Sequence, residues 1–177
     1  MFSKSIDQAK RRTSSSSTIY PIWFSDTFVF YSLDDTGNSF AWVDQVARWF
    51  TYFLICSDIP VRGALSCDDF YADRNNNLYY GPALVEAYEY AEAQDWIGFL
   101  LSPSSVLQLD NLGYPASERL DYAYCHVPFK KGRENRIGKL PACILGQWST
   151  INGKNACLDN LADISHMVYA LRFSRGS

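Results

Sequence analysis

The spacing of apolar residues along the chain predicts a series of strands and helices. Two short apolar runs within residues 18–32 flank Ser25 and Asp26, a pattern typical of a β-hairpin closed by a tight turn. Pro21 has no backbone N–H to donate to a neighbouring strand. The first strand of this hairpin is therefore expected to start at, or run along, the edge of a sheet.

A long helix is predicted after the hairpin. Over residues 40–54 the apolar side chains recur every three or four positions, which indicates a largely buried helix, and Asn38 or Ser39 is its expected N-cap. Residues 59–67 form a β-branched run that predicts a strand. The polar, asparagine-rich residues 68–77 indicate a loop or the tip of a hairpin.

The remaining residues are predicted to alternate between the two types of element. Gly81 followed by Pro82 suits the start of an alanine-rich helix, and Ser102, Pro103 and Gly113 suit the cap, first turn and end of a short one. Further strands are expected at 96–102, 120–129 and 140–148, and a closing amphipathic helix at 155–173. Strands that alternate with helices predict an α/β sandwich, in which a mixed sheet is covered by helices.

Composition restricts the class of protein. The chain has 177 residues, 47% of them apolar and 16% aromatic, which suits one domain with a core rich in large rings. Its net charge of −3 argues against a protein that coats DNA, RNA or an anionic membrane, and it lacks an apolar run of the ~18–20 residues that span a bilayer. Residues 1–17 are polar and are expected to form a flexible tail before a domain at 18–177. We therefore expect a cytoplasmic protein.

The cysteines and histidines do not indicate a metal cage or a nucleophile. Five cysteines are scattered without a C-x-x-C pair, and they are predicted to be free thiols that act as small buried apolar residues. Cys125 and His126 are adjacent on a predicted strand, so their side chains point to opposite faces and do not form a thiolate–imidazole pair.

Three segments carry a resemblance to a known family. The segments "IWFSDTFVFYS", "IPVRGALSC" and "LYYGPALVEAYEYAEAQDWIGFLLS" together resemble the class III nucleotide cyclase homology domain. Within that family they are most similar to the divergent bacterial branch that includes the pyrimidine cyclases of Pycsar antiphage defence. The resemblance covers roughly residues 18–105. It implies a ferredoxin-like sandwich with a mixed, mainly antiparallel sheet, and a head-to-tail homodimer with its sites between the protomers.

The resemblance also implies a metal site. In the family, two aspartates hold two divalent ions, Mg²⁺ or Mn²⁺, over a nucleoside triphosphate, and carboxylate oxygens suit both ions. Asp26 matches the aspartate at the hairpin turn. The other aspartate has no counterpart, because Asp7 in "SIDQAK" lies in no strand pattern. Val85 and Glu89 stand where the family has asparagine and arginine, and neither can clamp a phosphoryl group.

Further candidate residues surround this position. Arg62 lies within an apolar strand, where a charged side chain needs a polar partner. It is expected either to contact a nucleotide or, alternatively, to reach water or pair with Asp68 or Asp69. Gly63 would let a nucleotide or another backbone approach closely. Asp68 and Asp69 are candidates for assisting a cation, although a solvated loop is the favoured interpretation. No catalytic residue is assigned.

These observations favour a cyclase-like domain, degenerate or truncated, that acts in nucleotide sensing or partner binding. The alternative is an active cyclase that makes a 3′,5′-cyclic nucleotide of the cUMP or cCMP type in antiphage signalling. A weaker alternative is a structural subunit without a nucleotide site. The expected partners are a second copy of the chain and a nucleoside triphosphate, and no membrane, DNA or RNA.

Overall fold

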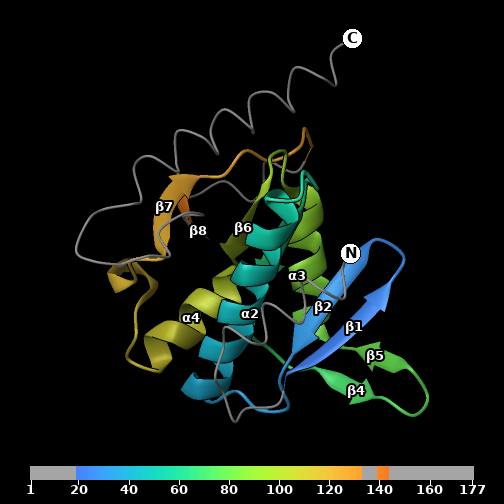
Figure 1. Ribbon diagram of the computed structural model, residues 1–177. Coiled ribbons are helices and arrows are strands. Elements are labelled where there is room, and N and C mark those ends of the chain that lie inside the picture. Colours follow the sequence, from blue (N-terminus) through green and yellow to red (C-terminus); the bar gives the residue numbers. More distant parts are fainter. Residues whose placement is uncertain (1–18, 133–138, 144–177) are drawn as a thin grey trace, which may run out of the picture.

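The computed structural model describes residues 19–132 and 139–143, which form a mixed α/β domain (Figure 1). The predicted tail at residues 1–17 and the predicted closing helix at 155–173 lie outside the described residues. The α/β class expected from the alternation of strand and helix patterns is confirmed.

Eight strands and three α-helices follow one another along the described chain. The strands are β1 (Tyr20–Phe24), β2 (Thr27–Tyr31), β3 (Arg62–Leu65), β4 (Tyr71–Asp73), β5 (Leu78–Tyr80), β6 (Gly98–Leu101), β7 (Tyr122–His126) and β8 (Lys139–Cys143). The helices are α2 (Gly37–Ile55), α3 (Pro82–Ala93) and α4 (Pro103–Asn111), with a 3₁₀ turn, η1, at Ala116–Glu118.

Four of the strands form one mixed sheet in the order β3-β6-β8-β7. Strand β3 runs parallel to β6, whereas β8 is antiparallel to both β6 and β7. The other strands form two separate antiparallel hairpins, β1–β2 and β4–β5. The expectation of a mixed, mainly antiparallel arrangement is therefore confirmed for the described strands.

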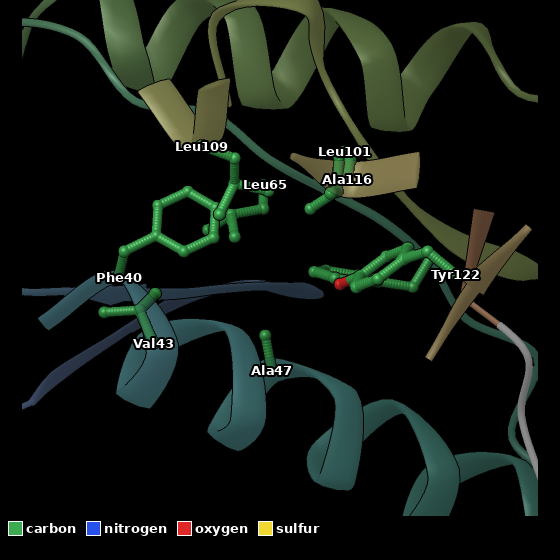
Figure 2. Close-up of a cluster of buried hydrophobic side chains, with 9 residues drawn as sticks. Phe40, Val43, Ala47, Leu65, Leu101, Leu109, Ala116 and Tyr122 are labelled. Atoms are coloured by element: carbon green, nitrogen blue, oxygen red, sulfur yellow. The ribbon is translucent and has the colours of Figure 1, made fainter. Parts of the chain in front are cut away.

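Helix α2 supplies most of one layer of the core. Its N-cap is Thr36, whose hydroxyl accepts a hydrogen bond from the Ser39 N–H at 3.3 Å, so the predicted cap at Asn38 or Ser39 is wrong by two or three positions. In Figure 2 the helix directs Phe40, Val43 and Ala47 toward apolar side chains of the sheet and of α4. The predicted apolar stripe is confirmed as the buried face.

Strand β6 lies at the centre of the sheet and is buried along its whole length. Its Leu100 and Leu101 are fully buried, and Phe99 and Leu101 join Leu65 of β3 in the core beside α2. A continuous apolar run predicts such a strand, because both of its faces are covered. The helices predicted on either side of it are confirmed, each with proline at its first turn.

The asparagine-rich segment forms the β4–β5 hairpin. The Asp73 carboxylate accepts hydrogen bonds from the backbone N–H groups of Asn75 and Asn76 at 3.0 and 3.2 Å and from the Asn76 side chain at 2.7 Å. These bonds lower the pKa of Asp73, the side-chain bond from Asn76 contributing most. The Asp73 side chain therefore stabilises the turn between β4 and β5.

The four described cysteines are free thiols, as predicted. Cys56 is exposed at the end of α2, so the predicted burial is wrong there, and Cys67, Cys125 and Cys143 are half-buried. None of the described helices combines the length and apolar character that crossing a membrane requires.

Candidate functional site

A large cleft of about 2260 Å³ lies among the β1–β2 hairpin, α2, β3 and α3. Helix α2 packs against the β1–β2 hairpin and against the segment that leads into β3, and both line the cleft. Phe28 and Phe30 of β2 pack on Phe50 of α2, with ring centroids 5.0 and 5.1 Å apart, and Ile59 and Val61 pack near the same helix just before β3. The position of the cleft thus follows from the apolar face of α2.

All five site residues predicted from the sequence line this cleft. They come from the hairpin turn, from β3 and from the loop after β3, and they are Asp26, Arg62, Gly63, Asp68 and Asp69. Val85 and Glu89 of α3 line it as well. The lining of the cleft therefore combines residues that the sequence separates by up to 63 positions.

Asp26 stands at the turn of the β1–β2 hairpin, as predicted. The turn consists of Ser25 and Asp26, and Ser25 adopts a positive φ of 56° to close it. The carboxylate is exposed, and its oxygen lies 3.5 Å from the Thr27 hydroxyl. An exposed carboxylate with one weak neighbour keeps most of its oxygen lone pairs available to a ligand.

Arg62 extends from the start of β3 toward α3. Its guanidinium donates to the Glu92 carboxylate at 3.0 Å and to the Gln94 carbonyl oxygen at 3.4 Å. The alternative that pairs Arg62 with Asp68 or Asp69 is therefore wrong, and the partner is Glu92. The pair is about 40% exposed, so it contributes little to stability and the guanidinium can exchange partners.

Gly63 packs against the core in this structure. A Cβ atom at this position would lie 2.9 Å from Cδ2 of Phe99, which is buried on the neighbouring strand. The close approach that calls for glycine here is thus made by the Phe99 ring. The sequence suggested a nucleotide contact for Gly63, and the structure shows this packing contact with Phe99.

Asp68 and Asp69 form the bend that leads from β3 to β4. The Asp68 carboxylate accepts a hydrogen bond from the Asp69 N–H at 2.7 Å, and the Asp69 carbonyl accepts one from Ala83 at 3.3 Å. Gly81, with a φ of 145°, lies against this carbonyl, where a Cβ atom would collide with it. The bend is therefore fixed to the start of α3, with both carboxyl groups at the cleft.

The cleft is strongly acidic. One arginine, Arg62, is set against eight carboxylates among its lining residues, namely Asp26, Asp34, Asp35, Asp68, Asp69, Glu89, Glu92 and Asp95. Such a lining attracts cations and repels a triphosphate that arrives without them. Within the described residues, no three carboxylate, histidine or cysteine side chains come together as a metal site.

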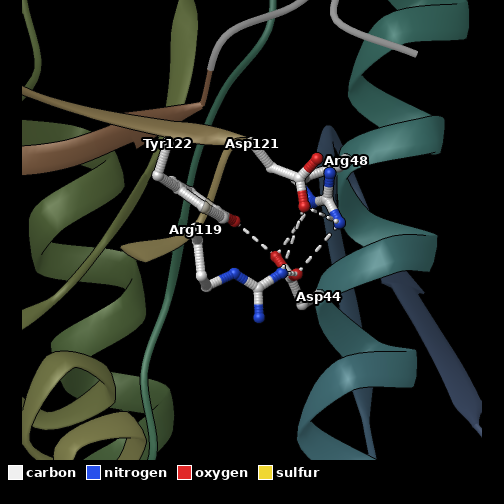
Figure 3. A network of polar contacts seen from close by, with 5 residues as sticks. All are labelled: Asp44, Arg48, Arg119, Asp121 and Tyr122. Carbon is white, nitrogen blue, oxygen red and sulfur yellow. Dashed lines mark hydrogen bonds and ion pairs between the residues drawn. The ribbon is translucent and has the colours of Figure 1, made fainter. Parts of the chain in front are cut away.

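A second group of charges, which the sequence did not reveal, joins α2 to β7 (Figure 3). Asp44 of α2 is fully buried, and its carboxylate pairs with Arg48 at 3.1 Å and with Arg119 at 2.5 Å. Asp121 lies 3.3 Å from Arg48 and 3.4 Å from Arg119. The Tyr122 hydroxyl also donates to Asp44.

This network is balanced in charge and rich in hydrogen bonds. Burial disfavours the charged form of Arg48, but the carboxylates of Asp44 and Asp121 outweigh this effect and raise the pKa of Arg48. Burial and the nearby Asp44 raise the pKa of Tyr122, so its hydroxyl stays protonated and donates a hydrogen bond to Asp44. Two arginines and two aspartates therefore compensate one another inside the protein, which is the arrangement of a structural anchor.

No family model, no curated protein and no solved structure matches this chain.

Proposed function

We propose that the chain is a class III cyclase-like domain that binds a nucleoside triphosphate together with Mg²⁺ or Mn²⁺ and acts as a nucleotide sensor. The observation that carries this proposal is the cleft, which is lined by all five residues that the sequence singled out. The ferredoxin-like form of the sandwich, with the hairpin turn beside the cleft, belongs to the same proposal.

The donor chemistry of the cleft suits a hydrated ion. Asp26 at the hairpin turn, and separately Asp68 and Asp69 at the bend after β3, offer hard carboxylate oxygens, which Mg²⁺ and Mn²⁺ prefer. Because the described residues assemble no three-ligand group, water and phosphate oxygens would supply most of the coordination. Metal and triphosphate should therefore bind as a unit, and the acidic lining disfavours the triphosphate alone.

The test is calorimetric titration with a non-hydrolysable nucleoside triphosphate, with and without Mn²⁺. We expect binding only when Mn²⁺ is present, and Asp26→Asn should weaken it at least tenfold, because this change keeps the shape of the side chain and removes its charge. Glu118→Gln is the matched control, since Glu118 is exposed on η1 and lies outside the cleft lining.

Two outcomes would contradict the proposal. Absence of Mn²⁺-linked binding in the wild-type protein would leave Asp26 as a turn residue. Equal binding by Asp26→Asn and the wild type would assign the metal to other carboxylates. Incubation of each of the four natural nucleoside triphosphates with Mn²⁺, followed by mass detection of cyclic products, separates a sensor from an active cyclase.

A homodimer forms part of this proposal. Large aromatic side chains are exposed on both hairpins, with Trp23 60%, Tyr71 48% and Tyr80 55% accessible. Aromatic residues are enriched where proteins associate. Light scattering at micromolar concentration should give twice the mass of one chain, and the mass of a single chain would refute the dimer.

A further inference from the structure

The cleft has a second property, which concerns the backbone of the strands beside it. Side chains on a strand alternate between two faces, so a cavity over one face touches every second residue. Here every residue of β2 and every residue of β3 lines the cleft. The cleft therefore runs along the edges of the two strands.

The edge of β2 that faces the cleft can be identified from its pairing with β1. Directly opposite residues in an antiparallel pair alternate between hydrogen-bonded and non-bonded positions. Phe30 lies opposite Pro21, which has no N–H, and Thr27 lies opposite Phe24 across the two-residue turn. The backbone N–H and C=O of Phe30 thus point away from β1, toward the cleft.

The edge of β3 follows in the same way from its pairing with β6. The carbonyls of Val61 and Leu65 accept hydrogen bonds from Gly98 and Ser102, at 3.1 and 2.9 Å. Because backbone groups of alternate residues point to opposite edges, those of Arg62 and Ala64 point away from β6. Among the described strands, β2 pairs only with β1, and β3 only with β6.

We propose that this cleft is a slot for one β-strand, supplied by an extended segment of a partner protein with an apolar centre and basic ends. Strand addition of this kind takes its affinity from main-chain hydrogen bonds. Here both edges of the incoming strand pair, one with β2 and the other with β3. This interaction uses the same cleft as the nucleotide binding proposed above, but it is a different activity, and its test uses neither nucleotide nor metal.

The volume of the cleft exceeds that of an ordinary small-molecule pocket. Small-molecule pockets hold about 300–1,000 Å³, whereas this cleft holds about 2260 Å³. Strands β2 and β3 have five and four residues. They therefore offer a slot for a strand of about 13–17 Å.

The distribution of side chains specifies the chemistry of the segment. The two helices contribute apolar side chains to the lining, with Phe40, Val43 and Phe50 from α2 and with Ala83 and Ala87 from α3. Four of the eight carboxylates lie at or beyond the strand ends. On β2 these are Asp26 at the turn and Asp34 past the far end, and on β3 they are Glu92 beside Arg62 and Asp68 past Leu65. An apolar centre between basic ends complements this pattern.

The test uses a synthetic peptide and the full-length protein. The probe has six central residues of alternating isoleucine and threonine between two pairs of lysines. Its controls carry glutamates in place of the lysines, or N-methyl groups on either the odd or the even central residues. We expect the probe to bind and the glutamate peptide not to bind. Both N-methylated peptides should bind at least about tenfold more weakly than the probe. N-methylation blocks one peptide edge and leaves the protein unchanged.

Amide hydrogen exchange by NMR locates the bound strand. Protection should rise at Phe30, Arg62 and Ala64, whose N–H groups face the slot, and remain unchanged at Gly63 and Leu65. Ala64→Pro removes one slot-facing N–H and should weaken binding. If this variant fails to fold, the N-methylated peptides decide on the wild-type protein.

Three results would overturn the proposal. The first is absence of binding at about 1 mM probe, which would mean that the binding free energy is smaller in magnitude than about 4 kcal/mol. The second is full binding by one of the two N-methylated peptides, which would indicate addition to a single outer edge. The third is protection without the alternation along β3, which would place the peptide elsewhere.

Discussion

Within the described residues, carboxylates gather in two regions that differ in burial and in counter-charge. Asp44 is fully buried, and its charge is balanced by Arg48 and Arg119. The carboxylates of the cleft lie around an open volume with Arg62 as their counter-charge. The first region has compensated its charges within the fold, and the second leaves them for a ligand to compensate. Charge compensation therefore separates a structural anchor from a candidate binding site more clearly than residue type does.

Replacing Asp44 tests the anchor most severely. Asp44→Ala leaves Arg48 and Arg119 with a missing counter-charge and the Tyr122 hydroxyl with no acceptor in the network. We expect a loss of about 3–5 kcal/mol of unfolding free energy, measured by urea denaturation, since removing one member of a buried charge network costs this much. A loss below about 1 kcal/mol would contradict the assignment of this network as an anchor.

Removing one hydroxyl tests the same region more finely. Tyr122→Phe deletes the hydrogen bond to the Asp44 carboxylate and keeps the ring in the core. It should cost about 1.5–3 kcal/mol of unfolding free energy, as expected for a hydrogen bond to a charged group. Tyr124→Phe on the same strand is the matched control, because Tyr124 is 42% exposed, and it should change stability by less than about 0.5 kcal/mol.

The pH dependence of stability should follow the buried region at alkaline pH. Burial raises the pKa of the Cys143 thiol from 9.0 to about 12, and it also raises the pKa of Tyr122. The folded state then holds more protons than the unfolded state above pH 9, so stability is full below that pH and is lost as the pH rises toward 12. Urea midpoints at pH 8 and pH 10.5 measure this loss. Cys143→Ala should reduce it, whereas Cys56→Ala, at an exposed thiol, should not.

The smallest effect is expected in the cleft. Asp26→Asn and Asp69→Asn should each leave the unfolding free energy within about 0.5 kcal/mol of the wild type, or raise it slightly, because each relieves repulsion among like charges. Any increase should shrink at high salt, where exposed charges are screened. A loss above about 1.5 kcal/mol for either variant would assign the cleft carboxylates to the fold, and the contrast between the two regions would disappear.

Local patterns were sufficient to predict most of the elements. The two short apolar runs on either side of Ser25 and Asp26 predicted the first hairpin, and the three- and four-residue spacing after residue 40 predicted α2. Strand β6 followed from its apolar run. The short strands β4 and β5 have three residues each, too few for a periodic signal, so the sequence indicated only a loop or hairpin tip there.

The partners of charged residues could not be predicted, because they are distant in sequence. Asp44 and Arg48 are spaced like an ordinary exposed pair on a helix, and their partner Arg119 lies 75 residues beyond Asp44. Arg62 meets Glu92, 30 residues away, where nearby aspartates had been the expected alternative. The positions of the cleft carboxylates were predictable as hairpin and loop residues, whereas their shared cleft arises from tertiary packing on α2.

Pro21 also limits how many chains can assemble through this hairpin. The outer edge of β1 lacks the N–H that a growing sheet would use at that position, and an edge of this kind resists further strand addition. On its other side the hairpin faces a slot bounded by β3 as well as β2. A strand captured there has no remaining edge to offer to a third chain. Assembly at this site should therefore stop at one segment per protein, a fixed stoichiometry that does not propagate into fibres.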